Sequence, residues 1–285
     1  MGTGGLPSRR DALKTSIAAG LGAAFLLGLG GCSGNDGIYS ANQDETETEQ
    51  EHGAYDWTLM GTDEHGRTAF CPDGQVASSC GIDVSDHNGT IDWNAVAQDG
   101  ISFAFLRAGY RGYTEGGIFA DERFEANLEG ASAAGLNVGA YFYSSAVDED
   151  EAREEAQYLL DCLAGRLEGC YLVFDQEIAD GVQGRANSLT REQYTNNAVA
   201  FCEVVEAAGH PAIVYSNRKH LVKLDLTGLG GRELWYAEYG VDNPQTLHDF
   251  MIWQYSDSGT VAGVEGYVDM DLWFPTDYLL SKQEA

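Results

Sequence analysis

Apolar and polar positions follow two periods along residues 81–280. Short, mostly apolar runs indicate strands, whereas apolar residues spaced three and four apart indicate helices. Strands are predicted at 81–85, 102–108, 136–143, 171–177 and 211–216, with three short ones at 234–237, 251–255 and 267–269. Helices are predicted between the first five strands, at 91–97, 124–135, 149–163 and 190–208.

Repeated strand–helix units imply a parallel sheet covered by helices. Right-handed crossovers either close such a sheet into a barrel or wind it as an open sheet. No glycine-rich phosphate loop follows a predicted strand, which disfavours an open nucleotide-binding sheet. The sequence therefore predicts an α/β fold for residues 81–280, an irregular TIM-type barrel with five strand–helix units and three short strands.

The composition supports one substantial core and narrows the class of partner. The chain has 285 residues, of which 44% are hydrophobic and 21% charged, and this excludes disorder throughout. Lys and Arg number 16 against 45 Asp and Glu, a formal net charge of −29. Because nucleic acids are bound largely through cationic side chains that displace counterions, no nucleic-acid partner is expected.

The first residues have the pattern of an export signal. Paired arginines at 9–10 precede an apolar run at 17–31, shorter than the roughly 20 residues that span a bilayer. Residues 1–31 are therefore interpreted as a signal peptide that resembles the twin-arginine type. Residues 29–32 resemble a bacterial lipobox, in which Cys32 would be lipidated and anchor the exported protein to the outer face of the cell membrane. A soluble secreted protein cleaved near Gly31 is the alternative.

Two further segments precede the predicted barrel. Residues 32–54 are polar and acidic, so we expect an extended tether without a core. Residues 55–80 read as a short lead-in segment, with a hairpin that turns at 61–66.

Export gives the cysteines a meaning, because disulfides persist in oxidising compartments. Cys71 with Cys80, and Cys162 with Cys170, are candidate disulfides, which leaves Cys202 as a buried free thiol. The spacing of Cys and His matches no zinc motif, and no metal or cofactor is predicted.

Several carboxylates lie at the ends of predicted strands, and barrel enzymes have their catalytic residues at the carboxyl ends of their strands. Asp175 and Glu177 close the strand at 171–177, two residues apart and so on one face. Such a pair can divide into one protonated acid and one carboxylate, as glycosidic cleavage requires. Asp83 lies inside the first strand and Asp269 ends the last, and these two strands are neighbours in a closed barrel. The alternatives are a turn-capping role for Asp83 and a solvated strand end for Asp269.

Aromatic and polar side chains accompany these acids. Aromatic rings bind the apolar faces of sugars, although packing in the core is an alternative explanation for each of them. Two polar side chains in apolar strands are expected to face inward and to bond acids or substrate. The predicted substrate-binding residues are Tyr143, Tyr215, Trp235, Tyr239, Gln254 and Arg107.

Residues 81 to about 274 resemble glycoside hydrolase family 25, the Chalaropsis-type lysozymes or N-acetylmuramidases. The matches are short but follow the order of the family through most of the domain. They are Gly81–Ser85 with Gly89, Ile91–Trp93, Phe105–Gly109, Asn127, Gly135–Leu136, Val138–Ser144, Asp175 with Glu177, Ile213–Asn217, Leu234–Ala237 with Tyr239, Trp253–Ser256 and Val268–Asp269.

The resemblance implies hydrolysis of the β-1,4 bond between N-acetylmuramic acid and N-acetylglucosamine in peptidoglycan, without a metal. By position, Glu177 matches the general acid of the family, and Asp175 the carboxylate that assists the acetamido group of the substrate as it attacks the anomeric carbon. Asp83 and Asp269 match the two remaining acids of the site. The implied course is retention through an oxazolinium-type intermediate. Asp271 departs from the family, which often has Asn there.

Other functions stay open at this stage. An inactive module that binds wall glycans would share the same cleft, and a metal-dependent hydrolase would use the acids together with His87 as ligands. A lipidated scaffold for envelope proteins is a third hypothesis. The expected partner is the peptidoglycan glycan strand, with membrane contact through a lipid anchor only and a monomeric protein.

Overall fold

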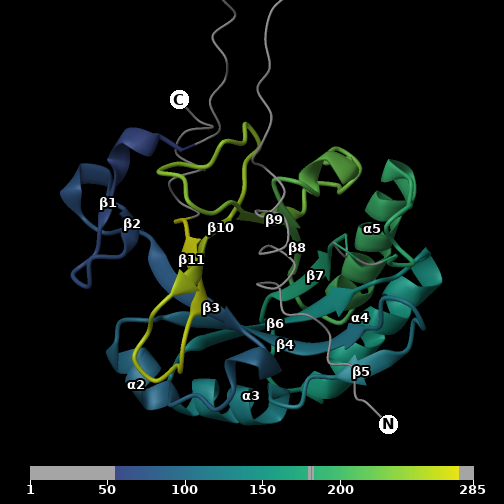
Figure 1. Ribbon diagram of the computed structural model, residues 1–285, viewed down its shortest axis with the longest axis horizontal. Coiled ribbons are helices and arrows are strands. Elements are labelled where there is room, and N and C mark those ends of the chain that lie inside the picture. Colours follow the sequence, from purple (N-terminus) through teal and green to yellow (C-terminus); the bar gives the residue numbers. More distant parts are fainter. Residues whose placement is uncertain (1–54, 179–180, 182, 276–285) are drawn as a thin grey trace, which may run out of the picture. The chain divides into compact units, whose positions relative to one another are not determined.

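A closed barrel of eight strands dominates the computed structural model, which describes residues 55–178, 181 and 183–275 (Figure 1). The predicted signal peptide at 1–31, Cys32 and the tether at 32–54 lie outside these residues. The sheet order is β3-β11-β10-β9-β8-β7-β6-β4, and pairing of β3 with β4 closes the ring. The strands are β3 (Ser79–Val84), β4 (Phe103–Arg111), β6 (Asn137–Ser144), β7 (Leu172–Gln176), β8 (Ala212–Asn217), β9 (Glu233–Ala237), β10 (Ile252–Gly259) and β11 (Val268–Trp273). The predicted irregular TIM-type barrel is confirmed.

Helices cover the outside of the first half of the barrel (Figure 1). They are α2 (Trp93–Gln98), α3 (Phe124–Ala133), α4 (Glu149–Leu163) and α5 (Arg191–Ala207). Helix α4 begins where the Asp148 side chain accepts a hydrogen bond from the backbone N–H of Glu151, and α5 begins where Thr190 caps Gln193 in the same way. Within the described residues, none of the helices combines the length and the apolar character needed to cross a bilayer.

The last strands depart from the predicted pattern in direction and length. Strand β11 runs antiparallel to both β10 and β3. Only residues 260–267 connect β10 to β11, too few for the crossover that a parallel pair requires. Strand β8 is followed by a single 3-10 turn, η4 (Leu221–Lys223), so the fifth predicted strand–helix unit lacks an α-helix. A further short strand, β5 (Ile118–Ala120), pairs with the end of β4 and was not predicted.

The lead-in segment forms the predicted hairpin. Strands β1 (Met60–Thr62) and β2 (Thr68–Phe70) pair antiparallel, flanked by the 3-10 turns η1 (Trp57–Leu59) and η2 (Pro72–Gly74). Tyr55 anchors the segment to the barrel domain, because its hydroxyl donates to the carbonyl of Phe250 at 3.2 Å and its ring lies 4.2 Å from that of Phe274.

The predicted disulfides are wrong, because all five described cysteines are free thiols. Each of three of them has a different neighbour. Cys80 hydrogen-bonds Tyr255 of β10, and Cys162 hydrogen-bonds Tyr158 one turn earlier in α4. The sulfur of Cys170 lies 3.5 Å from Nδ1 of His210. Proximity in sequence therefore did not bring Cys71 to Cys80 or Cys162 to Cys170. Cys202 is a buried free thiol, as predicted.

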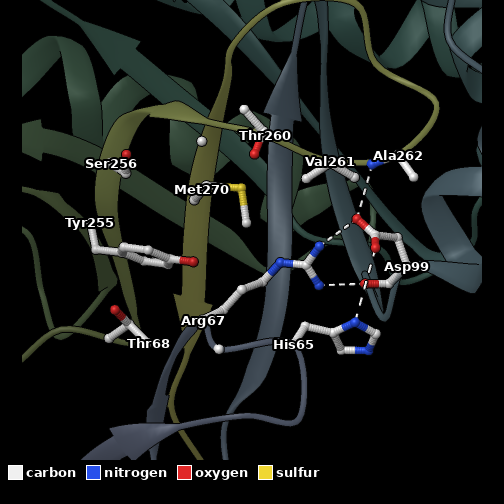
Figure 2. A pocket seen from close by; sticks show the side chains of 12 residues that line it. His65, Arg67, Thr68, Asp99, Tyr255, Ser256, Thr260, Val261, Ala262 and Met270 are labelled. Atoms are coloured by element: carbon white, nitrogen blue, oxygen red, sulfur yellow. Dashed lines mark hydrogen bonds and ion pairs between the residues drawn. The ribbon is translucent and has the colours of Figure 1, made fainter.

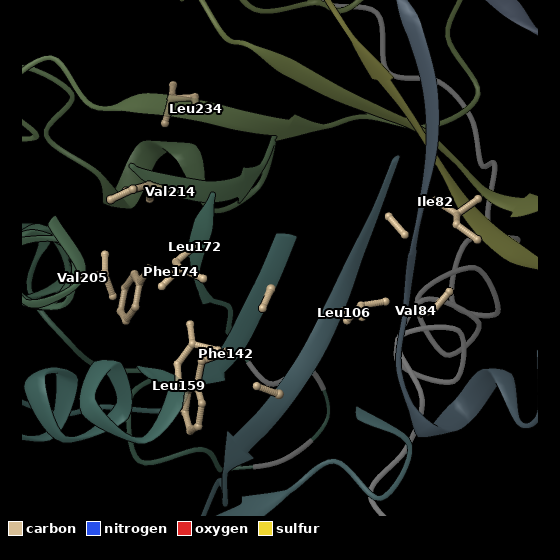
Figure 3. Close-up of a cluster of buried hydrophobic side chains, with 14 of the residues drawn as sticks. Ile82, Val84, Leu106, Phe142, Leu159, Leu172, Phe174, Val205, Val214 and Leu234 are labelled. Carbon is tan, nitrogen blue, oxygen red and sulfur yellow. The ribbon is translucent and has the colours of Figure 1, made fainter. Parts of the chain in front are cut away.

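Two apolar cores lie on the two sides of the barrel wall. The outer core packs the strands against the helices, with Phe142 facing Leu159 of α4 and Phe174 facing Val205 of α5 (Figure 3). The inner core fills the barrel with large side chains, among them Phe105, whose ring centroid lies 4.9 Å from that of Trp235 across the interior. The interior is thus a packed core, as expected for a barrel of eight strands.

Glycines make room for the inner aromatic rings. Gly139 lies directly opposite Phe105 in the register of β6 and β4, and a Cβ on Gly139 would approach that ring to 2.3 Å. Gly81 stands opposite Phe103 in the same relation, with the same 2.3 Å approach. Small and large residues therefore alternate between adjacent strands so that the layers fill without overlap.

We expect Gly139→Ala to lower the free energy of unfolding by about 1–3 kcal/mol, because the added methyl group overpacks the barrel interior. Urea denaturation measures the change. Gly117→Ala is the matched control: its Cβ would meet only ordinary contacts at 3.6 Å, so its effect should stay within about 0.5 kcal/mol. Equal stability of the two variants would contradict this account of the inner core.

Candidate active site

Two carboxylates meet across the junction that closes the barrel. Asp83 of β3 lies directly opposite Asp269 of β11 in the antiparallel register, so both side chains share one face. The sequence predicted Asp269 at the end of the last strand, but it is the second residue of β11. Because β11 runs against the other strands, its start lies at the rim where the parallel strands finish. The predicted proximity of Asp83 and Asp269 is confirmed.

The second acidic pair belongs to β7, the third strand from β3 around the ring by way of β4 and β6. Asp175 is buried within β7, and Glu177 follows the last residue of the strand. Between them, Gln176 points outward and donates to the carbonyl of Ala146 at 2.7 Å. The two acids therefore face the other way, into the barrel mouth, as the sequence spacing predicted.

Glu177 has polar neighbours that the sequence analysis did not assign. Asn217 at the end of β8 donates from Nδ2 to Oε2 of Glu177 at 2.9 Å, and Nδ1 of the buried His220 lies 3.7 Å from the same oxygen. The strand-end position of Asn217 was a signal that could have identified it. His220 lies in a loop, and no local pattern marks it.

A hydrogen-bond network connects the two halves of the mouth. The hydroxyl groups of Tyr215 and Tyr239 both donate to Oε1 of Gln254, at 2.9 and 2.5 Å. Nε2 of Gln254 donates in turn to Asp83. Tyr215 stands opposite Asp175 in the register of β8 and β7. Gln254 therefore holds Asp83 in place and is itself held by two tyrosines, which confirms that its side chain faces an acid.

The structure corrects part of the predicted sugar-binding set. Trp235 is 0% exposed, and its indole Nε1 donates to Oδ1 of the buried Asp271 at 2.8 Å. Tyr215 and Gln254 are also buried. These side chains pack below the carboxylates and support them, because inward aromatic residues fill the interior of so narrow a barrel. Tyr143 and Tyr239 remain partly exposed at the mouth.

Tyr143 lies beside the acids of β7. It is opposite Asp175 in the register of β6 and β7, and its hydroxyl accepts a hydrogen bond from that of Tyr113 at 2.8 Å. Burial raises the pKa of Tyr143 well above its ordinary value, and the negative charge of Glu177 adds to the rise. The hydroxyl therefore keeps its proton and remains a hydrogen-bond donor in the mouth.

Arg107 forms ion pairs with two acids at the rim of the barrel. Its Nη2 donates to Asp86 at 2.6 Å and its Nε to the buried Asp121 at 2.8 Å. These bonds connect β4 to η3 (Asp86–Asn88), the turn that follows β3. Arg107 thus orders the loops next to Asp83.

The described part of the chain offers no cluster of three or more His, Cys, Asp or Glu residues suited to a metal ion. His87, the nitrogen ligand of the metal hypothesis, is 43% exposed and lies 3.5 Å from Asp86. The geometry instead provides two carboxylate pairs at one rim, with amide and hydroxyl donors around them. Such a mouth can deliver a proton and stabilise positive charge that develops in a transition state.

A separate cavity of about 670 Å³ lies outside the barrel wall (Figure 2). Tyr255 and Met270 line it, and they alternate along their strands with the inward Gln254 and Asp271. Arg67 of the lead-in segment binds Asp99 there at 2.5 Å. This cavity marks where the lead-in hairpin docks, and it is not part of the acidic mouth.

Comparisons with known proteins find a matching family and several related proteins. The model of the family "Glycosyl hydrolases family 25" matches residues 82–264. An autolytic lysozyme of Clostridium acetobutylicum is 29% identical over 191 residues, which are 67% of this chain and 54% of that protein. Lysozyme M1 of Streptomyces globisporus is 28% identical, with 66% of this chain and 65% of that protein covered.

A solved structure is similar in fold to this chain. The bacterial lysozyme from Streptomyces coelicolor superposes with a TM-score of 0.57 at 26% identity, over 73% of this chain and 98% of its own. The chain spans only about half to two thirds of the length of the two curated relatives.

Proposed function

The chain belongs to glycosyl hydrolase family 25, and we propose that its barrel domain hydrolyses the β-1,4 bond between N-acetylmuramic acid and N-acetylglucosamine in peptidoglycan. One observation carries the proposal. Asp83 of β3 faces Asp269 in register, and Asp175 and Glu177 face the same mouth from β7, the third strand around the ring from β3. Four carboxylates converge where barrel enzymes place their chemistry.

In the proposed mechanism, Glu177 gives its proton to the glycosidic oxygen as the bond to the anomeric carbon breaks. The carbonyl oxygen of the substrate's own 2-acetamido group attacks that carbon from the opposite face and forms an oxazolinium ring. Asp175 stabilises the positive charge that develops on the acetamido N–H. Water then opens the ring and returns a proton to Glu177, so the product retains its configuration.

The remaining acids act on the electrostatics of the mouth. Asp83 and Asp269 add negative charge that favours an oxocarbenium-like transition state. The proton of Tyr143 supplies a donor for a sugar oxygen or for the carboxylates of β7. Asn217 orients Glu177 through its bond to Oε2.

Identification of the products tests the proposal. Purified protein incubated with a peptidoglycan of defined structure should release fragments whose new reducing end is N-acetylmuramic acid, as read by mass spectrometry after borohydride reduction. New reducing ends on N-acetylglucosamine would assign a different bond and overturn the proposal. Binding to peptidoglycan without any new reducing ends would favour the inactive wall-binding module.

Removal of metal separates the proposal from a metal-dependent hydrolase. Because the carboxylates themselves supply the chemistry, we expect the rate of reducing-end release to stay within twofold after exhaustive dialysis against EDTA. A loss of activity that zinc or calcium restores would contradict the metal-free mechanism.

Gln254 is expected to act as a positioning residue. Its replacement by alanine removes the donor to Asp83 and the acceptor of two tyrosine hydroxyls, and hydrogen bonds to charged groups contribute about 1.5–3 kcal/mol. We expect Gln254→Ala to lower kcat about 10–100-fold with little change in KM. Gln157→Ala, at an exposed position of α4, is the control and should match the wild type. A normal kcat in Gln254→Ala would show that the network is dispensable.

We further propose that the protein is exported and carries a lipid on Cys32, with residues 32–54 as the tether that lets the monomeric barrel reach the wall. The apolar run at 17–31, followed at once by Cys32, supports this proposal. Radiolabelled palmitate incorporated into the wild type but not into Cys32→Ser would test it.

A further inference from the structure

Strand β4 contains an irregularity that changes which of its side chains face the mouth. Arg107 pairs with Tyr141 of β6, but the next pairs are Gly109 with Phe142 and Tyr110 with Tyr143. One extra residue is therefore accommodated in β4, as in a β-bulge. Tyr141 and Tyr143 both face inward, so Arg107 and Tyr110 do as well, although they are three residues apart. Regular alternation would have turned Tyr110 outward.

The short strand β5 adds a second ring to Tyr110. Phe119 lies directly opposite Tyr110 in the antiparallel register, and their rings stack with centroids 5.4 Å apart and planes inclined by 21°. The guanidinium carbon of Arg107 lies 5.3 Å from the centroid of Tyr110. Since Asp86 and Asp121 fix Arg107, the stack rests on an ordered support.

Phe119 remains 46% exposed at the open end of this stack. The hairpin backbone approaches the ring closely: a Cβ on Gly112 would lie 3.2 Å from it. An exposed ring held in a fixed orientation is a ready surface for a ligand with an apolar face.

The location of the stack defines what it would meet. Pairing of β3 with β4 ends at Leu106, and β5 pairs with β4 from Gly109 onward, so β5 continues the wall beyond the end of β3. Phe119 therefore stands past the rim on the Asp83 side of the mouth. A ligand there would extend out of the acidic mouth and would not occupy the reacting position.

We propose that Tyr110 and Phe119 form a stacking platform for a sugar ring of the glycan strand, outside the sugars at the four carboxylates. The inference rests on the proposed function, since it takes the ligand to be the same glycan. The apolar C–H face of the sugar packs on Phe119, and the platform lengthens the stretch of glycan held by the protein. Its contribution requires a strand long enough to reach from the acids to β5.

Binding measured in a Glu177→Gln background tests the platform without hydrolysis. Isothermal titration calorimetry with soluble, uncrosslinked peptidoglycan strands measures the effect. Phe119→Ala should raise the dissociation constant about 5–10-fold, as expected for loss of one aromatic contact. Phe119→Tyr keeps the ring and should bind within twofold of the background. Val222→Ala, an exposed apolar residue of η4, is the matched control and should also be unchanged.

Strand length supplies a second measurement. In the active protein, Phe119→Ala should lower kcat/KM for long strands about 5–10-fold more than for the shortest fragment that is cleaved. Equal binding by Phe119→Ala and Val222→Ala, or an equal loss for Phe119→Ala and Phe119→Tyr, overturns the platform and leaves the hydrolase proposal intact. Length-dependent binding that needs Phe119, in a protein that releases no reducing ends, overturns the hydrolase proposal and keeps the platform.

Discussion

Glu177→Gln is expected to lower kcat for peptidoglycan hydrolysis by about 10²–10⁴-fold, the range associated with loss of a general acid. Glutamine preserves the shape of the side chain and its contact with Asn217, but it has no acidic proton for the leaving oxygen. The rate of reducing-end release measures the effect. Binding of the glycan should persist, because the other three carboxylates and the mouth are unchanged.

Glu168→Gln is the matched control. Glu168 is an exposed acid in the connection between α4 and β7, and this connection lies at the opposite end of the barrel from the four carboxylates. It should retain full activity, and circular dichroism should show that both variants are folded. If Glu177→Gln kept more than a tenth of the wild-type kcat, proton donation would have to be assigned to another group. Asp175→Asn would then be the next variant to measure.

The sequence was sufficient to locate the acids of the mouth. Two-residue spacing placed Asp175 and Glu177 on one face, and closure of the barrel brought Asp83 next to Asp269. Both inferences depend only on the alternation of side chains along strands and on the order of strands in a ring. They are insensitive to errors of one or two residues in the bounds of an element.

Features that depend on register and packing could not be predicted in this way. Alternation alone places Trp235 and Tyr239 on the same face, but only the depth of each residue in the barrel decides that Trp235 is buried against Asp271. The bulge at Arg107 and the antiparallel course of β11 likewise depend on pairing between strands. Local sequence carries little information about such long-range pairing.

The largest effect on stability is expected at an ion pair that the sequence analysis did not identify. Nε of Arg111, near the end of β4, lies 2.6 Å from Oε1 of Glu155 in α4, and both side chains are buried. Arg111 also donates to the carbonyl of Gly116 at 2.6 Å and pairs with the exposed Glu154 at 2.7 Å. The pair therefore joins the base of the β4–β5 hairpin to the helix that covers it.

Burial raises the pKa of Glu155 to about 7, although hydrogen bonds from Ser144 and the charge of Arg111 oppose the rise. A carboxyl group whose folded pKa lies above its unfolded value binds its proton more tightly in the folded state. Its stabilising contribution is complete below about pH 4.5 and is lost as the pH rises through about 7. As the pH rises from 5 to 8, the free energy of unfolding of the wild type should therefore fall by up to about 3 kcal/mol relative to that of Glu155→Gln, whose side chain has no proton to lose.

Arg111→Met makes this dependence on pH steeper. Without the guanidinium, an ionised Glu155 would be buried with no cation beside it, and breaking a buried pair in this way costs about 3–5 kcal/mol. We expect that loss in the free energy of unfolding at pH 8, and a much smaller one at pH 5, where Glu155 is protonated. Urea denaturation at the two pH values measures both. Arg111→Met combined with Glu155→Gln should recover most of the loss at pH 8, because it removes the buried charge itself. A loss of the same size at both pH values would mean that Arg111 stabilises the fold by packing and by its bond to Gly116, and not through the charge of Glu155.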